Sequence, residues 1–134
     1  AWRGGGAFGG NSKVAINNVV TGDSVTWETE VVGVALDLDN GKIYFHKSGT
    51  YINSGNPASG TDNGGQYDLP TAEDDQWLLG VSAYNLATWN VNFGGYTTMS
   101  ISSAATDANG YGTFEYAPPS GYYALCSKNL AEYG

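Results

Sequence analysis

Residues 33–50 read GVALDLDNGKIYFHKSGT, and this stretch predicts the local fold. Apolar residues alternate with small or polar ones on both sides of Asn40-Gly41, which is the pattern of two half-buried β-strands. Asn-Gly is the favoured pair for a two-residue type I′ turn, because both turn residues need positive φ angles. The stretch therefore predicts a β-hairpin whose turn is Asn40-Gly41.

This turn determines which residues of the two strands face each other. It places Asp39 opposite Lys42 as a cross-strand ion pair, and it places His46 opposite Ala35 on a polar face. The other face is then apolar and carries Val34, Leu36, Leu38, Ile43 and Phe45. Since a slip of one residue would exchange the two faces, the pattern supports this register.

Asp37 and Asp39 also raise a metal-binding interpretation, because carboxylates two residues apart begin a calcium loop. In a loop that starts at Asp37, the fifth position is Gly41, which has no side-chain oxygen. The twelfth position is Ser48 instead of a bidentate glutamate. We therefore expect a turn at this place, and we expect no metal ion or other cofactor.

The composition predicts a single all-β domain that spans residues 1–134. Hydrophobic residues make up 41% of the chain and charged residues only 13%, which argues against disorder. The 20 glycines favour turns and the 10 tyrosines favour strands. No window shows a sustained helical period, so we expect no helix. Strands are predicted over residues 13–20, 24–29, 30–38, 42–47, 76–84, 87–93, 113–116 and 122–127, with a long polar loop over 48–75.

The formal net charge of −8 makes nucleic acid an improbable partner, because an acidic surface repels phosphate groups. The five basic residues are scattered along the chain and form no patch. No apolar run approaches the roughly 18 residues that a membrane span needs, so we expect no membrane insertion.

Candidate catalytic residues are few. His46 is the only histidine, and no Gly-x-Ser-x-Gly motif accompanies it. Two pairs of carboxylates could serve a glycoside hydrolase, and they are Glu28 with Glu30 and Asp74 with Asp75. The alternative to a binding protein is therefore a carbohydrate-active enzyme on a jelly-roll sandwich, with these pairs as its acids.

Tyrosines in the predicted loops suggest a ligand-binding surface. Tyr51, Tyr67 and Tyr96 lie among glycine, serine and asparagine residues. That composition provides contact area from rigid rings and adaptable hydrogen bonds from small polar groups. These three tyrosines are the predicted ligand-binding residues, and a protein or a surface glycan is the predicted ligand.

Three stretches resemble motifs of the SPRY domain family, of the kind found in proteins of bacteriophages and environmental viruses. GVALDLDNGKIYFHKSGT (33–50) is similar to the family's hairpin block, and TWNVNFG (88–94) is similar to its Val-Asn-Phe-Gly strand. FEYAPPSGYYALCSKNL (114–130) resembles the block that ends the domain. The three blocks occur in the family's order, with residues 95–113 forming a connection that is shorter in many members.

The resemblance implies a bent antiparallel β-sandwich of the concanavalin A-like jelly-roll type, and a binding module without catalytic residues. It implies partners that include other subunits of a virus particle or extracellular assembly, and therefore a location in the virion or outside the cell. Because the family has several strands before the hairpin, the resemblance also implies that this chain is the C-terminal part of a longer polypeptide, or a domain that another chain completes.

Overall fold

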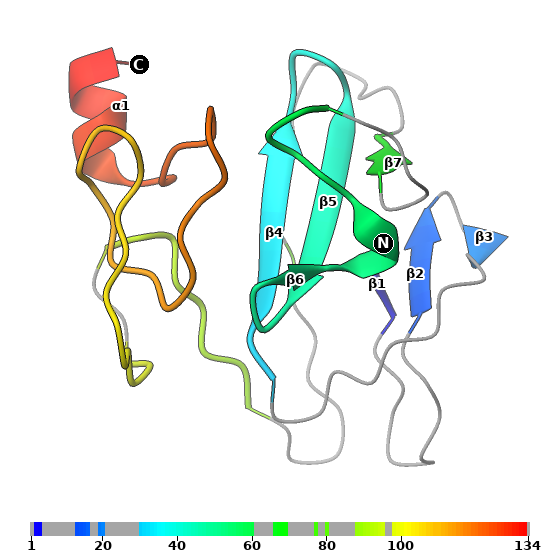
Figure 1. Cartoon of the computed structure of the whole chain (residues 1–134), viewed down its shortest axis with the longest axis horizontal. Helices are drawn as coiled ribbons and strands as arrows, with labels where there is room; N and C mark the ends of the chain where they lie inside the picture. The colour runs from blue at the N-terminus through cyan, green and yellow to red at the C-terminus, as the bar shows by residue number, and fades with distance from the viewer. Residues whose placement is uncertain are drawn as a thin grey trace. The chain divides into compact units, whose positions relative to one another are not determined.

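The computed structural model describes residues 2–3, 13–16, 19–20, 30–60, 66–69, 77, 80, 88–95 and 98–133. The chain divides into two compact units (Figure 1). The N-terminal unit comprises residues 1–56 and 61–89, and the C-terminal unit comprises residues 57–60 and 90–134. The described strands are antiparallel and helix is scarce, which is compatible with the predicted all-β class. A single domain over residues 1–134 stays a prediction.

A small antiparallel sheet in the N-terminal unit has the order β1-β2-β3. Its strands are β1 (Trp2–Arg3), β2 (Lys13–Ile16) and β3 (Val19–Val20). Residues 13–20 were expected to form one strand, and this prediction is wrong, because β2 and β3 pair with each other in antiparallel fashion. Two asparagines stand between them in the sequence, and asparagine favours tight turns.

The larger sheet is arranged around β5 (Lys42–Lys47). Strand β4 (Val32–Asp37) pairs with one edge of β5, while β6 (Thr50–Tyr51) and β7 (Gln66–Asp68) pair with different parts of β5 (Figure 1). A single 3₁₀ turn, η1 (Ile52–Ser54), follows β6. Two strands and a 3₁₀ turn thus lie in residues 48–75, which the sequence predicted as a polar loop.

The hairpin of β4 and β5 exists, but its predicted register is wrong by two residues. Asp37, not Asp39, lies opposite Lys42, and Gly33 lies opposite His46. The predicted ion pair of Asp39 and Lys42 is therefore absent, and the Lys42 ammonium instead contacts the carboxylate of Asp68 on β7. Since the shift is an even number of residues, each strand residue still lies on the face that the sequence predicted.

The side chain of Asp37 accounts for the longer turn. Its carboxylate accepts hydrogen bonds from the backbone N–H of Asn40 at 3.0 Å and from the Asn40 side-chain amide at 2.8 Å. The loop Leu38–Gly41 is closed by a hydrogen bond from Gly41 N to Leu38 O, and Gly41 alone has a positive φ, of 64°. An aspartate that binds the backbone ahead of it favours such a turn, and this competes with the two-residue turn.

A two-residue hairpin turn with positive φ angles occurs one connection later. Ser48 and Gly49 join β5 to β6, with φ angles of 45° and 87°. The sequence did not predict this turn, because serine is a less usual residue than asparagine in the left-handed region.

Both faces of β5 bury side chains. On the predicted apolar face, Phe45 packs with Ile52 and Tyr67 to form the core of the described N-terminal unit. On the predicted polar face, Tyr44 is completely buried, and its hydroxyl donates a hydrogen bond to the side-chain oxygen of Gln66 at 2.6 Å. On the apolar face, however, Val34 and Leu36 of β4 remain exposed.

The C-terminal unit is built around the ring of Phe114 and contains little regular structure. A Cβ atom on Gly94 would lie 2.8 Å from both the Phe114 ring and the Ala124 side chain, and one on Gly112 would lie 2.4 Å from the ring. The side chain of Asn92 donates to the backbone oxygen of Thr113 at 2.7 Å. Two glycines and an alanine therefore leave just enough room for one aromatic ring.

The strands predicted for this unit are mostly wrong. Residues 88–93 and 122–127 form no described strand, and residues 113–116 contribute only a single bridge between Ala105 and Phe114. The chain ends instead with a helix, α1 (Ser127–Tyr133), although none was expected. A helix of seven residues is too short to show a hydrophobic period, and its buried residue is the polar Asn129.

The predicted strand over residues 24–29 lies outside the described residues, as does most of the strand predicted over residues 76–84.

Candidate binding surface

The structure does not bring the three predicted ligand-binding tyrosines together among the described residues. Tyr51 lies in β6 and is half-buried, and burial raises the pKa of its hydroxyl to about 12. Tyr67 lies in β7 and is only 7% exposed, because its ring packs on Phe45 with ring centroids 6.0 Å apart. Tyr67 is therefore a core residue and not the loop residue that was predicted. Tyr96 lies outside the described residues.

His46 is enclosed by its own hairpin. A Cβ atom on Gly33 would lie 1.7 Å from Nε2 of His46, so the imidazole occupies the space above this glycine. The Tyr51 ring meets the imidazole edge-on, with centroids 5.3 Å apart. The backbone N–H of Gly49 donates to Nδ1 at 3.1 Å, which leaves the proton of the neutral ring on Nε2. Burial lowers the pKa of His46 below its usual value, which favours this neutral form.

Of the carboxylates proposed as enzyme acids, only Glu30 is described. It accepts a hydrogen bond from the Ser48 hydroxyl and lies 3.4 Å from the Lys47 ammonium. The Ser48 hydrogen bond and the Lys47 charge hold the pKa of Glu30 below its usual value. Glu30 thus connects the chain before β4 to the β5–β6 turn. The other three proposed acids, Glu28, Asp74 and Asp75, lie outside the described residues.

The two aspartates of the first motif block have different surroundings. The Asn40 side chain and backbone hold the pKa of Asp37 below its usual value, while Asp39 is exposed in the turn. Within the described ranges, His, Cys, Asp and Glu side chains form no group of three or more that could hold a metal ion. Asp37 serves the turn, through its two hydrogen bonds to Asn40.

A buried carboxylate that the sequence did not single out organises the C-terminal unit. Asp107 is 6% exposed, and one of its oxygens accepts hydrogen bonds from the backbone N–H groups of Asn109 and Tyr111. The other oxygen accepts from the N–H of Ala124 at 2.8 Å and from the side-chain amide of Asn129 at 2.7 Å. Burial raises the pKa of Asp107, but these hydrogen bonds outweigh burial and hold it below its usual value.

Asn129 completes this network from helix α1. Its side-chain amide donates to the backbone oxygen of Ala124 as well as to Asp107, and its side-chain oxygen accepts from the amide of Asn109 at 3.0 Å. We call Asp107, Asn109, Ala124 and Asn129 the Asp107 network. A buried polar network is stable only when its members are satisfied, and Asp107 receives four hydrogen bonds here.

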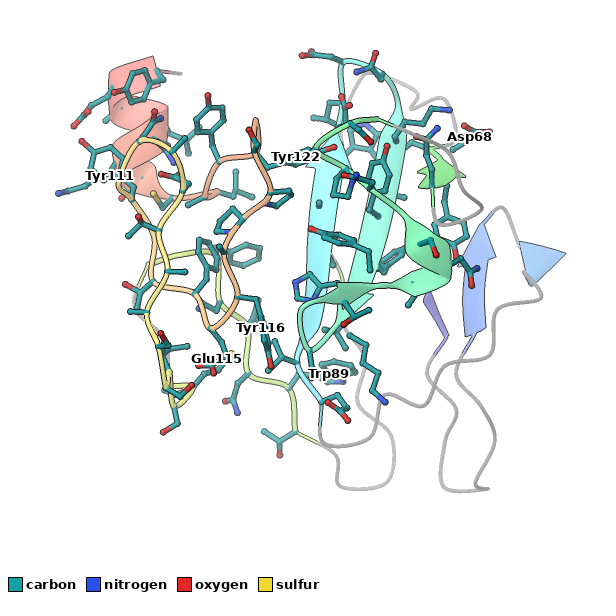
Figure 2. The ribbon with its side chains drawn as sticks, in the orientation of Figure 1. Asp68, Trp89, Tyr111, Glu115, Tyr116 and Tyr122 are labelled. Atoms are coloured by element: carbon teal, nitrogen blue, oxygen red, sulfur yellow. The ribbon has the colours of Figure 1, made fainter. Side chains whose placement is uncertain are left out.

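Tyr111 forms a second connection between the turn and the helix. Its hydroxyl donates to the carboxylate of Glu132 at 2.7 Å, and the Lys128 ammonium lies 5.2 Å from the centre of its ring (Figure 2). Lys128 and Glu132 are four residues apart, so they share one side of α1. This side of the helix therefore faces the turn that contains Tyr111.

The same contacts leave several apolar side chains of the C-terminal unit exposed. Along residues 122–126, Ala124 is buried while Tyr123 and Leu125 are exposed. On α1, Leu130 and Tyr133 are three residues apart and exposed by 60% and 67%. We call Tyr123, Leu125, Leu130 and Tyr133 the C-terminal apolar surface.

This surface was missed at the sequence level, although a signal for it existed. Residues 122–127 were expected to form a strand, and alternate residues of a strand point to opposite sides. Tyr123 and Leu125 share one side and Ala124 has the other, so the small residue indicates which side packs inward. The exposure of Leu130 and Tyr133 had no such signal, because no helix was predicted.

A comparison of the chain with protein-family models, curated proteins and solved structures finds no match. No helix in the described part of the chain has the length and apolar character that crossing a membrane requires.

Proposed function

We propose that this chain is a non-catalytic binding or structural module of a virus particle or another extracellular assembly, built on a SPRY-type β-sandwich. Its partners are a protein or a surface glycan, and they include other subunits of the same assembly. The three motif blocks support the SPRY family. The described side chains support a binding role without catalysis.

The observation that carries the proposal is the C-terminal apolar surface. Tyr123, Leu125, Leu130 and Tyr133 are 56% to 67% exposed, and they lie in the segment before α1 and on α1 itself. Large exposed apolar side chains that gather in one short segment of the chain favour an interaction site. Tyrosine suits protein and glycan ligands alike, because its ring offers apolar area and its hydroxyl a hydrogen bond. The Asp107 network fixes the segment that carries these residues.

The use of the carboxylates also supports a binding role over an enzymatic one. A catalytic acid or base needs a proton-transfer atom within reach of a substrate. Five described carboxylates instead accept hydrogen bonds from the chain itself: Glu30 from Ser48, Asp37 from Asn40, Asp107 from four donors, Glu115 from Ser102 and Glu132 from Tyr111. These hydrogen bonds hold loops of the chain in place.

The motif blocks fit this proposal because their residues serve packing. Gly94 belongs to the second block, while Phe114 and Ala124 belong to the third, and these residues meet around one ring. Asn129, also in the third block, anchors α1 to Asp107. The third block thus carries both scaffold residues and three residues of the C-terminal apolar surface, Tyr123, Leu125 and Leu130.

A glycan array probed with the labelled chain tests the proposal, together with co-sedimentation with the assembly that contains the chain. We expect binding without chemical change, so a bound glycan recovered from the chain has an unaltered mass. We also expect Tyr123→Ala and Tyr133→Ala to weaken binding, while Leu38→Ala, at an apolar residue of similar exposure in the N-terminal unit, leaves it intact. Turnover of any bound glycan would contradict a non-catalytic role.

A further inference from the structure

Asparagine followed by glycine is the sequence most prone to lose a side-chain amide, and this chain contains it three times, as Asn40-Gly41, Asn63-Gly64 and Asn109-Gly110. Asparagine is a labile residue, and a following glycine has no side chain to obstruct attack by its backbone nitrogen on the asparagine amide. Asn63 lies outside the described residues, so the structure allows a comparison of Asn40 with Asn109.

The Asp107 network holds both reacting groups of the pair Asn109-Gly110. The Asn109 side-chain amide donates to the side-chain oxygen of Asn129 at 3.0 Å, and its backbone N–H donates to the Asp107 carboxylate at 3.0 Å. The N–H of Gly110 donates to the backbone oxygen of Asp107, also at 3.0 Å. Asp107 and Asn129 are 6% and 8% exposed. The amide and the attacking nitrogen are therefore both bound to buried residues.

The turn Leu38–Gly41 holds the pair Asn40-Gly41 less firmly, at the end of the β4–β5 hairpin (Figure 1). The N–H of Gly41 lies 3.3 Å from the backbone oxygen of Leu38, whereas such bonds usually measure about 2.7–3.2 Å. Asn40 is exposed, and its side-chain amide donates to the carboxylate of the half-buried Asp37 at 2.8 Å. The attacking nitrogen is thus weakly bound, and the amide is open to water.

We propose that Asn40 is a site of spontaneous deamidation, and that the reaction puts a carboxylate in place of a hydrogen-bond donor on which the turn Leu38–Gly41 depends. The inference is independent of the proposed function, because the reaction needs no partner.

The reaction consumes only water. The backbone nitrogen of Gly41 gives up its proton and forms a bond to Cγ of Asn40, while the bond from Cγ to Nδ2 breaks and the amide nitrogen takes up a proton and leaves as ammonia. Water then opens the cyclic imide that results. Addition of water at Cγ gives aspartate, and addition at the backbone carbonyl carbon gives isoaspartate. No atom is oxidised or reduced.

Either product changes the contact with Asp37 from attraction to repulsion. In the parent chain, Asp37 accepts hydrogen bonds from the side-chain amide of Asn40 at 2.8 Å and from its backbone N–H at 3.0 Å, and these bonds hold the pKa of Asp37 below its usual value. Both products lack the amide donor and carry a negative charge instead. Since neighbouring carboxylates disfavour each other's charged form, the pKa of Asp37 should rise and the turn should open.

Peptide mapping by mass spectrometry of the full chain, incubated in mildly alkaline buffer, measures the conversion of each asparagine separately. We expect Asn40 to react about tenfold faster than Asn109 in the folded chain, because one hydrogen bond more or less changes a rate by about this factor. In concentrated urea the two should react at similar rates, since glycine follows both. Asp107→Ala should accelerate the reaction of Asn109 and leave that of Asn40 unchanged.

Two variants test the effect on the turn. Asn40→Asp carries the carboxylate of the product, and Asn40→Ala is the matched control, because it removes the amide without adding a charge. Titration of the Asp37 carboxyl group by NMR should show a higher pKa in Asn40→Asp than in Asn40→Ala. Amide hydrogen exchange at Gly41 should also be faster in Asn40→Asp than in the parent chain.

The inference fails if Asn40 stays unmodified, if Asn40 and Asn109 react equally fast in the folded chain, or if their rates differ as much in urea as in buffer, because the sequence and not the fold then sets the difference. An Asp37 pKa in Asn40→Asp that equals the one in Asn40→Ala would overturn the effect on the turn. None of these outcomes bears on glycan or protein binding, so the proposed function stands or falls separately.

Discussion

Six consecutive residue pairs follow one register in the hairpin of β4 and β5, whereas the region around Asp107 contains only a single isolated bridge and a short helix. In the hairpin, backbone N–H groups donate hydrogen bonds to backbone carbonyl oxygens, while side chains determine the turn and the packing. In the C-terminal unit, the side chains of Asp107 and Asn129 bond directly to backbone groups.

The two regions should therefore differ in how strongly a single substitution destabilises them. A ladder distributes its hydrogen bonds over many residues, and a surface substitution removes none of them. A network centred on one carboxylate concentrates four hydrogen bonds on a single residue. We therefore expect the largest effect of a single substitution at Asp107 and smaller effects in the hairpin.

Replacing Asp107 with alanine should have the largest effect on stability. The substitution leaves the buried N–H donors of the Asp107 network without an acceptor, and each such donor costs about 1–3 kcal/mol. We expect the free energy of unfolding to fall by about 3 kcal/mol or more, as measured by urea unfolding followed by circular dichroism. Asp39→Ala, at an exposed carboxylate, is the control and should change stability by less than about 0.5 kcal/mol. Equal effects of the two variants would contradict a central role for Asp107.

Replacing Gly33 with alanine should lower the free energy of unfolding by less than the Asp107 substitution does. The Cβ of Gly33→Ala would lie 1.7 Å from Nε2 of His46, so the imidazole must leave its position. Overpacking of this kind costs about 1–3 kcal/mol, which thermal unfolding can measure. Gly95→Ala is the matched control, because no atom lies within 4 Å of its added Cβ. The second substitution His46→Ala should recover part of the loss, and an absence of recovery would argue against the contact.

Acid should weaken the hairpin before it weakens the Asp107 network. Burial holds the pKa of His46 in the folded chain below the ordinary value of 6.5, so protons bind more readily to the unfolded chain. The stability that His46 contributes is complete above pH 6.5 and falls as the pH drops from there toward the lowered pKa. His46→Gln should remove this dependence from urea unfolding curves. The same slope in the variant and the parent would refute the assignment.

The Asp107 network should respond only to stronger acid. Its hydrogen bonds hold the pKa of Asp107 below 3.8, so its stabilising contribution is present above that pH and is lost as the pH falls further through the lowered pKa.

Loss of the Lys42 charge should have the smallest effect. The Lys42 ammonium contacts the carboxylate of Asp68, whose side chain is 83% exposed. Exposed ion pairs contribute about 0–1 kcal/mol, and salt screens them. Lys42→Met keeps most of the apolar stem and should lower the free energy of unfolding by less than about 1 kcal/mol. If the free energies of unfolding of the parent chain and of Lys42→Met still differ in high salt, Lys42 contributes to stability through more than its charge.

The hairpin was largely predictable from the sequence, because its strands alternate strictly between apolar and other residues. The alternation placed Val34, Leu36, Ile43 and Phe45 on one face, as the structure has them. It did not determine the register, because Asn40-Gly41 allows both a two-residue and a four-residue turn. The choice depends on two hydrogen bonds that Asp37 makes to Asn40.

The C-terminal unit was much less predictable, for a physical reason. Its organising contacts join residues that are far apart in the sequence, such as Asp107 and Asn129, and no periodic pattern records such contacts. The helix that carries Asn129 is too short for its period to be visible, and its inward residue is polar. For the same reason the exposure of Leu130 and Tyr133 on this helix could not be predicted, and the tyrosines chosen from loop composition did not identify the C-terminal apolar surface.

Residue-resolved amide hydrogen exchange of the parent chain and of Asp107→Ala tests the central claim, that two different kinds of hydrogen bonding hold the two regions together. We expect the substitution to abolish protection at the amides of Asn109, Tyr111 and Ala124, while the amides of Gly33 and Ala35 in the hairpin keep theirs. Retained protection at Ala124, or an equal loss in the hairpin, would contradict the claim.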